Sequence, residues 1–226
     1  MSKHATQELS EEGKSRIEIM EEALNGECET PDCIWLDLAL QVLDLNKIDR
    51  KEFISALHNL ITLGRGKFRN LMIIGRSNCA KTFLIKPLMS IYKGKVFENP
   101  ARDKYGWVGA QSASVIVLQA FRYSKELIAW SDMLLLLEGE TVKLPSPKNH
   151  FVADIVIHSG NDVPIFATAP SKIEYSRYSV DFAKETEMMD SRWKVFEFTH
   201  IFKEVDQIKV TPCGHCFSKL VFMNEQ

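Results

Sequence analysis

Residues 70–88, "NLMIIGRSNCAKTFLIKPL", constrain the fold more than any other stretch of this chain. The apolar run "NLMII" predicts a buried strand, and Gly75 predicts the turn that follows it. Lys81 and Thr82 then open a stretch with helical periodicity. Strand, glycine turn, Lys-Thr and helix follow the order and the G-x-x-x-x-G-K-T spacing of a phosphate-binding loop. The departure is Ala80, which stands where the second glycine is expected.

A loop of this kind binds phosphate through its backbone N–H groups and the start of the following helix. Lys81 would then meet the terminal phosphates of a nucleotide, and Thr82 would hold Mg²⁺. The methyl group of Ala80 would either clash with phosphate or only stiffen the loop. Cys79 is either a small loop residue or a reactive thiol. The alternative is an ordinary strand–turn–helix with Lys81 on the surface.

Composition indicates a globular chain with a sizeable core, because 45% of its 226 residues are hydrophobic and 26% are charged. The formal net charge of −2 gives no overall basic field, so any contact with DNA needs a local patch. The longest apolar run, "MLLLLEG", is too short to span a bilayer. The polar N-terminus carries no signal segment. We therefore expect a protein that is neither membrane-bound nor secreted, with free thiols at its five cysteines.

Periodicity divides the chain into a helical N-terminal region, an α/β region and a short tail. Residues 1–66 carry three helical patterns, and residues 67–208 alternate β-type runs with helical ones. The tail, residues 209–226, contains a Cys-x-x-Cys pair. We expect the first helix to follow a cap at Ser10, the second to lie within "DCIWLDLALQVLDL", and the third to follow a cap at Asp49.

Four short apolar runs predict strands in the α/β region: "NLMIIG", "ASVIVLQAF", "VPIFATA" and "WKVFEFTH". Helical patterns such as "KTFLIKPLMSIY" and "SKELIAWSDMLLLLEG" lie between some of them. Strands that alternate with helices favour a parallel sheet covered by helices. The predicted fold class is therefore α/β, a mainly parallel sheet with flanking helices preceded by a small helical region.

Hydrolysis of a bound nucleotide also needs a carboxylate on a nearby strand, which holds Mg²⁺ and positions the attacking water. The run "SVIVL" is a strand of the right kind, but Gln119 and Ala120 follow it. A glutamine hydrogen-bonds water, yet it neither offsets the charge of Mg²⁺ nor acts as a base. Glu126 and Asp132 come later, in a helical pattern that favours surface positions. The sequence thus predicts slow or absent ATP hydrolysis.

The order of motifs over about residues 65–205 resembles the superfamily 3 helicases. These are the AAA+-type ATPase domains of parvovirus nonstructural replication proteins, papillomavirus helicases and related mobile elements. "GRSNCAKTF" is similar to the Walker A loop, and "SVIVLQAFRYS" takes the place of Walker B. "LLEGETVKLPSPKN" resembles the B′ region, where a charged hairpin faces DNA, and "VPIFATAPSKI" resembles motif C. "MMDSRWKVFEF" resembles the arginine-bearing segment that follows.

The resemblance implies a role for each matching residue. Thr168 falls at the sensor position, although Ala169 and Pro170 follow it where relatives often place asparagine. Gln119 takes the place of a Walker B acid. Arg192 would be an arginine finger that reaches the nucleotide of a neighbouring subunit, and its alternative is a structural salt bridge. The implied ATP-binding residues are Gly75, Asn78, Cys79, Ala80, Lys81 and Thr82, the last with Mg²⁺.

The resemblance also implies partners. Lys143 and Lys148 would contact DNA, expected to be single-stranded; the alternative for each is a solvated loop. The resemblance also makes self-association as a hexamer-like ring possible, and weak phosphate contacts would add up in such a ring. DNA handling slightly favours the nucleus over the cytoplasm. Three functions stay open: an ATP-binding helicase domain of viral or mobile-element descent, a non-catalytic interaction or nucleic-acid-binding remnant of it, and an unrelated α/β binding protein.

The tail motif "PCGHCF" offers Cys213 and Cys216 as a zinc or redox pair. One pair supplies only two zinc ligands. Cys28 and Cys33 could complete a four-sulfur site if the two ends of the chain meet. A redox pair needs a helix start after a strand, which the pattern does not show. Unligated cysteines in a tight turn are the simplest alternative, and the sequence alone leaves all three open.

Overall fold

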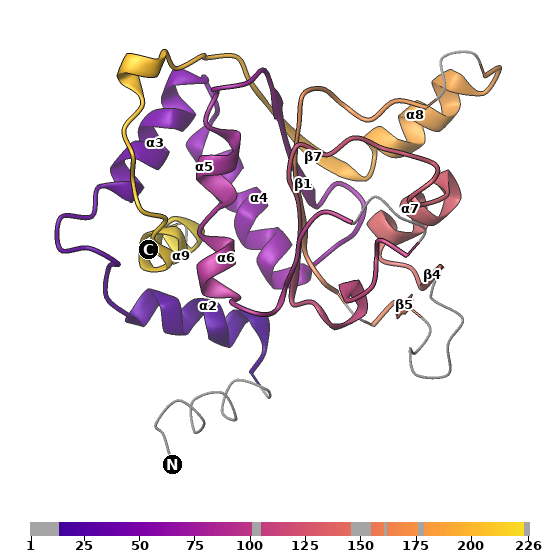
Figure 1. The fold of residues 1–226 in the computed structure, drawn as a ribbon, viewed down its shortest axis with the longest axis horizontal. Helices are drawn as coiled ribbons and strands as arrows, with labels where there is room; N and C mark the ends of the chain where they lie inside the picture. Colours follow the sequence, from indigo (N-terminus) through magenta and orange to yellow (C-terminus); the bar gives the residue numbers. More distant parts are fainter. Residues whose placement is uncertain (1–13, 101–104, 146–154, 161, 176–178, 224–226) are drawn as a thin grey trace.

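The computed structural model describes residues 14–100, 105–145, 155–160, 162–175 and 179–223. A five-stranded parallel sheet in the order β2-β3-β6-β1-β7 separates two helical layers (Figure 1). The predicted α/β class, with a parallel sheet and flanking helices, is therefore confirmed. The strands of this sheet are β1 (Asn70–Gly75), β2 (Val96–Phe97), β3 (Val115–Leu118), β6 (Ile165–Ala169) and β7 (Trp193–Phe198).

Alternate residues of each strand face opposite layers of the molecule. In β1, Leu71 and Ile73 belong to the hydrophobic core beneath the N-terminal helices. Met72 and Ile74 belong to a second core on the other face. Because both faces are covered, the inner strands β1, β3 and β6 read as mainly apolar runs, whereas the edge strand β7 carries Lys194 and Glu197. All four predicted strand runs are found in the sheet.

In the described part of the chain three helices precede the sheet, as predicted, but the cap of the first of them differs from the expected one. Ser15 caps it: the Ser15 side chain accepts the N–H of Glu18, and the Glu18 carboxylate accepts the N–H of Ser15. Ser10 lies outside the described residues. The predicted cap at Asp49 is confirmed, since its side chain accepts the N–H of Glu52. The helices are α2 (Arg16–Asn25), α3 (Trp35–Leu45) and α4 (Arg50–Leu63).

The last helix, α9 (Gly214–Phe222), lies among the N-terminal helices and contacts α2, α3 and α4 (Figure 1). Its Phe217 and Leu220 are buried in the same core as Trp35 and Leu57. The expectation of a tight turn at the tail cysteines is therefore wrong, because they open a helix. Tertiary packing rather than local propensity stabilises so short a helix. The boundaries at residues 66 and 208 stay predictions.

Two predicted helices are shorter than their patterns suggest. "KTFLIKPLMSIY" forms two short helices separated near Pro87, which has no N–H to donate. "SKELIAWSDMLLLLEG" becomes helical only from Trp130. None of the helices in the described part is long and apolar enough to cross a membrane. The remaining helices and strands are α5 (Lys81–Ile85), α6 (Leu88–Ile91), α7 (Trp130–Glu138), α8 (Phe182–Asp190), β4 (Val142–Leu144) and β5 (Ile155–Ile157).

Candidate functional site

The carboxyl ends of β1, β3, β6 and β7 meet at one edge of the sheet, where ligands bind to open parallel sheets. A pocket of about 790 Å³ opens there. It is lined by the stretch after β1, by residues that follow the other three strands, and by one side of α3. All six residues predicted to bind nucleotide line it: Gly75, Asn78, Cys79, Ala80, Lys81 and Thr82.

Gly75 ends β1 at a point where the neighbouring strand leaves no room for a side chain. Its φ is 148°, and a Cβ placed on it would lie 2.2 Å from the carbonyl oxygen of Phe198. Only glycine fits such a close backbone approach. Further along the loop, the carbonyl oxygen of Asn78 accepts the N–H of Phe202 over 2.8 Å. The loop is thus held at both points by backbone at the end of β7.

Ala80 has the left-handed backbone conformation that glycine adopts without strain, with φ 63° and ψ 17°. Asn78 also has a positive φ, 61°, which asparagine tolerates better than alanine does. The loop therefore keeps a left-handed turn before Lys81 although the glycine is missing. The alanine costs about 1 kcal/mol there, which is strain rather than disruption.

Lys81 turns back over the loop. Its Nζ donates to the carbonyl oxygens of Gly75 at 2.7 Å and Arg76 at 2.6 Å, and it lies 3.3 Å from Cys79 Sγ. The buried Cys79 thiol donates to the same Arg76 carbonyl at 2.9 Å. The ammonium group therefore lies over the loop backbone on the pocket, and Cys79 packs as a small buried residue.

Thr168 is buried at the end of β6 and fixes the turn that follows β3. Its Oγ1 accepts the N–H of Ala120 at 2.9 Å, and its carbonyl oxygen accepts the N–H of Phe121 at 2.7 Å. Gln119 does not line the pocket, and its backbone carbonyl oxygen accepts a hydrogen bond from Nδ2 of Asn99. Thr168 and Ala120 do line it. The sensor role of Thr168 and the catalytic role of Gln119 stay predictions.

Three ionisable side chains on the pocket were not predicted: Arg122, His200 and Asp206. Arg122 and His200 come shortly after β3 and β7, so their places after apolar strands were the available signal. Asp206 lies in a short turn that no sequence pattern marks. Among the described residues that line the pocket, it has the only carboxylate. Neither Glu126 nor Asp132 lines it.

The N-terminal helical region forms one wall of the pocket, which the sequence also did not predict. Leu38, Gln41 and Leu45 of α3 lie along it. Asn46 follows α3, and its Oδ1 accepts the N–H of His200 at 2.8 Å. This bond joins the end of α3 to the end of β7. The helical region is therefore part of the site.

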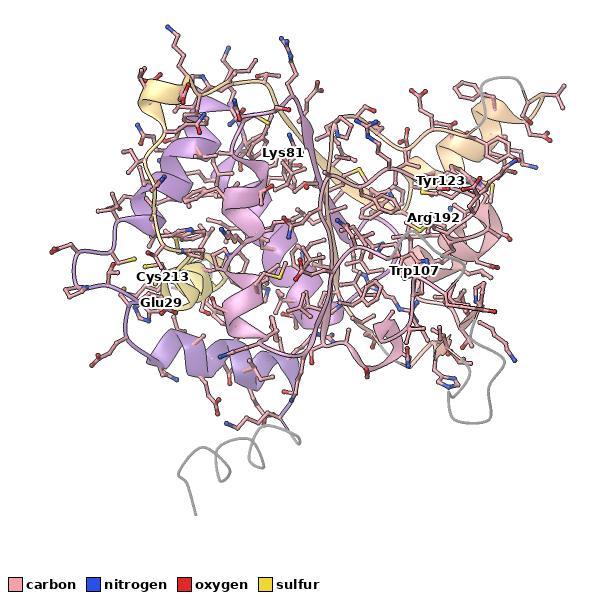
Figure 2. The ribbon with its side chains drawn as sticks, viewed as in Figure 1. Glu29, Lys81, Trp107, Tyr123, Arg192 and Cys213 are labelled. Carbon is pink, nitrogen blue, oxygen red and sulfur yellow. The ribbon has the colours of Figure 1, made fainter. Side chains whose placement is uncertain are left out.

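Arg192 lies at the other edge of the sheet, just before β7, and on the other layer from Lys81 (Figure 2). It is only 5% exposed, and its Nη2 is 2.7 Å from the Glu138 carboxylate. Lys67 pairs with the same carboxylate, and a hydrogen bond from Lys67, aided by the charge of Arg192, lowers the pKa of Glu138. Nη1 of Arg192 donates to the Met188 carbonyl. These contacts are those of a structural salt bridge, and the arginine-finger role stays a prediction.

The segment that resembles the B′ region contains β4, which pairs antiparallel with β5 further along the chain. Lys143 lies exposed on β4, opposite Val156 of β5. Lys148 lies outside the described residues. The DNA-binding role of both lysines stays a prediction.

Four of the five cysteines converge at a place apart from the pocket. The sulfurs of Cys28, Cys33, Cys213 and Cys216 all lie within 4.8 Å of one another. Figure 2 shows Cys213 next to Glu29 and away from Lys81. The two ends of the chain therefore meet, as the four-sulfur hypothesis requires, and the group could hold a metal such as zinc.

The protein environment shifts the thiol pKa values of Cys28, Cys213 and Cys216 in different directions. Burial raises the pKa of Cys28 and of Cys216. Burial also acts to raise the pKa of Cys213, but hydrogen bonds from the backbone of Cys216 and Glu29 to its sulfur outweigh it, so this pKa is lowered. Cys213 is therefore the thiol whose anionic form the backbone favours most.

The fold is similar to that of the C-terminal region of NrS-1. One apo structure of that region, its A form, aligns with a TM-score of 0.55 and 16% identity, over 90% of this chain and 47% of that chain. Another apo structure aligns with a TM-score of 0.50 and 15% identity, over 90% and 45% of the two chains. This chain thus spans slightly less than half of those structures, and the likeness shows the fold alone. No protein-family model and no curated protein matches the sequence.

Proposed function

We propose that this chain is a nucleotide-binding domain related to the superfamily 3 helicases, which binds ATP with Mg²⁺ and hydrolyses it slowly or not at all. The observation that carries the proposal is the pocket at the carboxyl edge of the sheet, where the loop from Gly75 to Thr82 keeps Lys81 over its backbone. Arg122 adds a second cation to the same pocket. Two cations and a concave backbone turn suit a polyphosphate.

The residues of the pocket divide by chemistry. Lys81 would bind the β- and γ-phosphates and Thr82 would hold Mg²⁺. Leu38, Val42 and Phe202 line the same pocket and offer apolar and aromatic surface, which suits a nucleobase. The pocket volume of about 790 Å³ lies within the range that holds ligands of nucleotide size.

The proposal of slow hydrolysis rests on where carboxylates lie. Ala120, which follows β3, offers no carboxylate, and its N–H already donates to the Thr168 hydroxyl. Asp206 is the only acid among the described lining residues and comes after β7, which β6 and β1 separate from β3 in the sheet. Removal of one group that stabilises transition-state charge costs about 3–4 kcal/mol. Hydrolysis is therefore expected to be slower by at least two to three orders of magnitude than in a complete site.

Two assays on the full chain test the proposal. Calorimetric titration with ATP and Mg²⁺ should show binding that Lys81→Ala weakens and Lys86→Ala, an exposed lysine on the same segment, does not. A malachite-green phosphate assay, with and without single-stranded DNA, should stay near its background. Wild-type protein without affinity for ATP would overturn the nucleotide site. Robust turnover that Lys81→Ala abolishes would overturn the slow hydrolysis.

A second function, DNA binding in a hexamer-like ring, is favoured by the β4–β5 pair, which takes the place of the B′ hairpin and exposes Lys143. Binding of single-stranded DNA should fall steeply with salt and fall further in Lys143→Glu, measured by fluorescence anisotropy. Sedimentation with ATP should show the assembled ring. A monomer without DNA affinity at low salt would instead favour a non-catalytic interaction module.

A further inference from the structure

We propose that Cys28, Cys33, Cys213 and Cys216 bind one zinc ion in a closed four-sulfur site that joins the two ends of the chain. The Sγ–Sγ distances from Cys216 are 3.6 Å to Cys28 and 3.5 Å to Cys33. Zinc–sulfur bonds of about 2.3 Å in tetrahedral geometry place neighbouring sulfurs about 3.8 Å apart. The four sulfurs are therefore already close to the spacing that a tetrahedral zinc ion requires.

The positions of the cysteines in the sequence also fit zinc. Four residues separate Cys28 from Cys33 and two separate Cys213 from Cys216, and both spacings occur in structural zinc sites. The two pairs come from the α2–α3 connection and from the start of α9, so only the fold brings them together. Convergence of two such pairs from distant parts of the chain is the arrangement that a shared metal ion requires.

Disulfide bonding fits this arrangement less well. A disulfide joins two sulfurs at about 2.05 Å and leaves each with one partner. Here Cys216 has two sulfur neighbours at nearly equal distances, and all five cysteines of the chain are free thiols. The N–H of Cys216 also points to Cys213 Sγ at 3.5 Å, which stabilises a thiolate ligand. Four protein ligands leave no open position, so the site is structural rather than catalytic.

The proposed ion would fix the start of α3, the helix that forms a wall of the pocket. α3 begins two residues after Cys33, and its N-cap residue, Ile34, makes no side-chain capping bond. On the other side of the cluster, Cys213 is the N-cap of α9. Zinc would therefore anchor α3 and α9 at their first turns, and the inference does not depend on whether the pocket binds ATP.

Metal analysis of the full chain, purified under reducing conditions, tests the inference. One zinc ion per chain is expected, and X-ray absorption should give four sulfur neighbours at about 2.3 Å. Cobalt(II) in place of zinc should give the absorption of a tetrahedral thiolate site. Cys213→Ser should lose at least nine tenths of the metal. Cys79→Ser is the matched control, since Cys79 lies in the phosphate loop, and it should keep one ion.

Two results would overturn the inference. Wild-type protein without bound zinc after exposure to zinc chloride, with all thiols free to alkylation, would show unligated cysteines. A mass lower by two hydrogens per bond under oxidising conditions, together with no metal, would show disulfides. If Cys213→Ser does not fold, the X-ray and cobalt absorption spectra of the wild type still show whether four sulfurs bind the metal. A chelator should also lower the melting temperature of the wild type, whereas a site without metal would leave it unchanged.

Discussion

The two edges of the sheet use their polar groups in opposite ways. At the amino edge, the two N–H groups of the buried Asn70 amide are shared among three backbone carbonyl oxygens, which lie 2.7–3.1 Å from Nδ2. Arg65, also fully buried, donates to two more carbonyls, and Arg192 pairs with Glu138. At the carboxyl edge, Lys81 contacts only atoms of its own loop, and a pocket of about 790 Å³ remains.

This difference separates structure from function within one sheet. Polar groups at the amino edge bond to other parts of the same chain and join β1 to α7 and β7, so their loss should lower the stability of the fold. Polar groups at the carboxyl edge face a cavity, so their loss should weaken a ligand and leave the fold intact. Open parallel sheets generally place their ligands at the carboxyl edge.

Asn70→Ala should have the largest effect. It removes a buried donor from the carbonyl oxygens of Leu137 and Arg192, whereas that of Gly66 still accepts the N–H of Arg69, so the free energy of unfolding should fall by about 3 kcal/mol. Urea denaturation measures this, and ATP affinity in the folded fraction should not change. Asn59→Ala, on the exposed face of α4, is the matched control and should stay within about 0.5 kcal/mol of wild type. An equal loss in both variants would remove the special role of the amino edge.

Arg192→Met should lower the free energy of unfolding by about 2 kcal/mol, because Glu138 loses one of its two cationic partners. The folded-state pKa of Glu138 is lowered, so this stabilisation is present above its unfolded pKa and is lost as the pH falls through the folded one. The difference in the free energy of unfolding between wild type and variant should therefore become smaller in acid. A variant of unchanged stability that loses ATP turnover in mixed assemblies would support the arginine finger instead.

Lys81→Ala should weaken ATP binding by about 1.5 kcal/mol, or roughly tenfold, because one charge-assisted contact to phosphate is lost. Its melting temperature should stay close to that of wild type, since the lost contacts are within one loop. Calorimetry and thermal unfolding on the same sample measure both. A destabilised Lys81→Ala with unchanged affinity would reverse the assignment of the two edges.

Ala80→Gly should have the smallest effect, and of the opposite sign. Glycine removes the left-handed strain of Ala80 but gains unfolded-state entropy, so stability should rise by about 0.5 kcal/mol or stay level, and ATP affinity should not fall. Ala56→Gly within α4 is the control and should destabilise by about 1 kcal/mol. Destabilisation of similar size at both positions would show that the loop prefers alanine.

The sequence predicted the fold class and the phosphate-loop stretch because each depends on local pattern. "NLMIIG" and "VPIFATA" are strands buried on both faces, and Gly75 marks the turn. The remaining features depend on how distant parts of the chain pack together. Nothing local shows that α9 returns to α2, that α3 lines the pocket, or that Asp206 and Arg122 approach it. The four cysteines were recognisable as two pairs, but only the fold brings their sulfurs within 4.8 Å.

The most direct test of the account is the chemical state of nucleotide bound to the full chain. Protein in excess over ATP and Mg²⁺ is separated from free nucleotide, and the bound species is identified by chromatography after a long incubation. The account predicts that wild-type protein retains nucleotide, that it is recovered as ATP, and that Lys81→Ala retains less. Rapid conversion to ADP, or no retained nucleotide in the wild type, would contradict it.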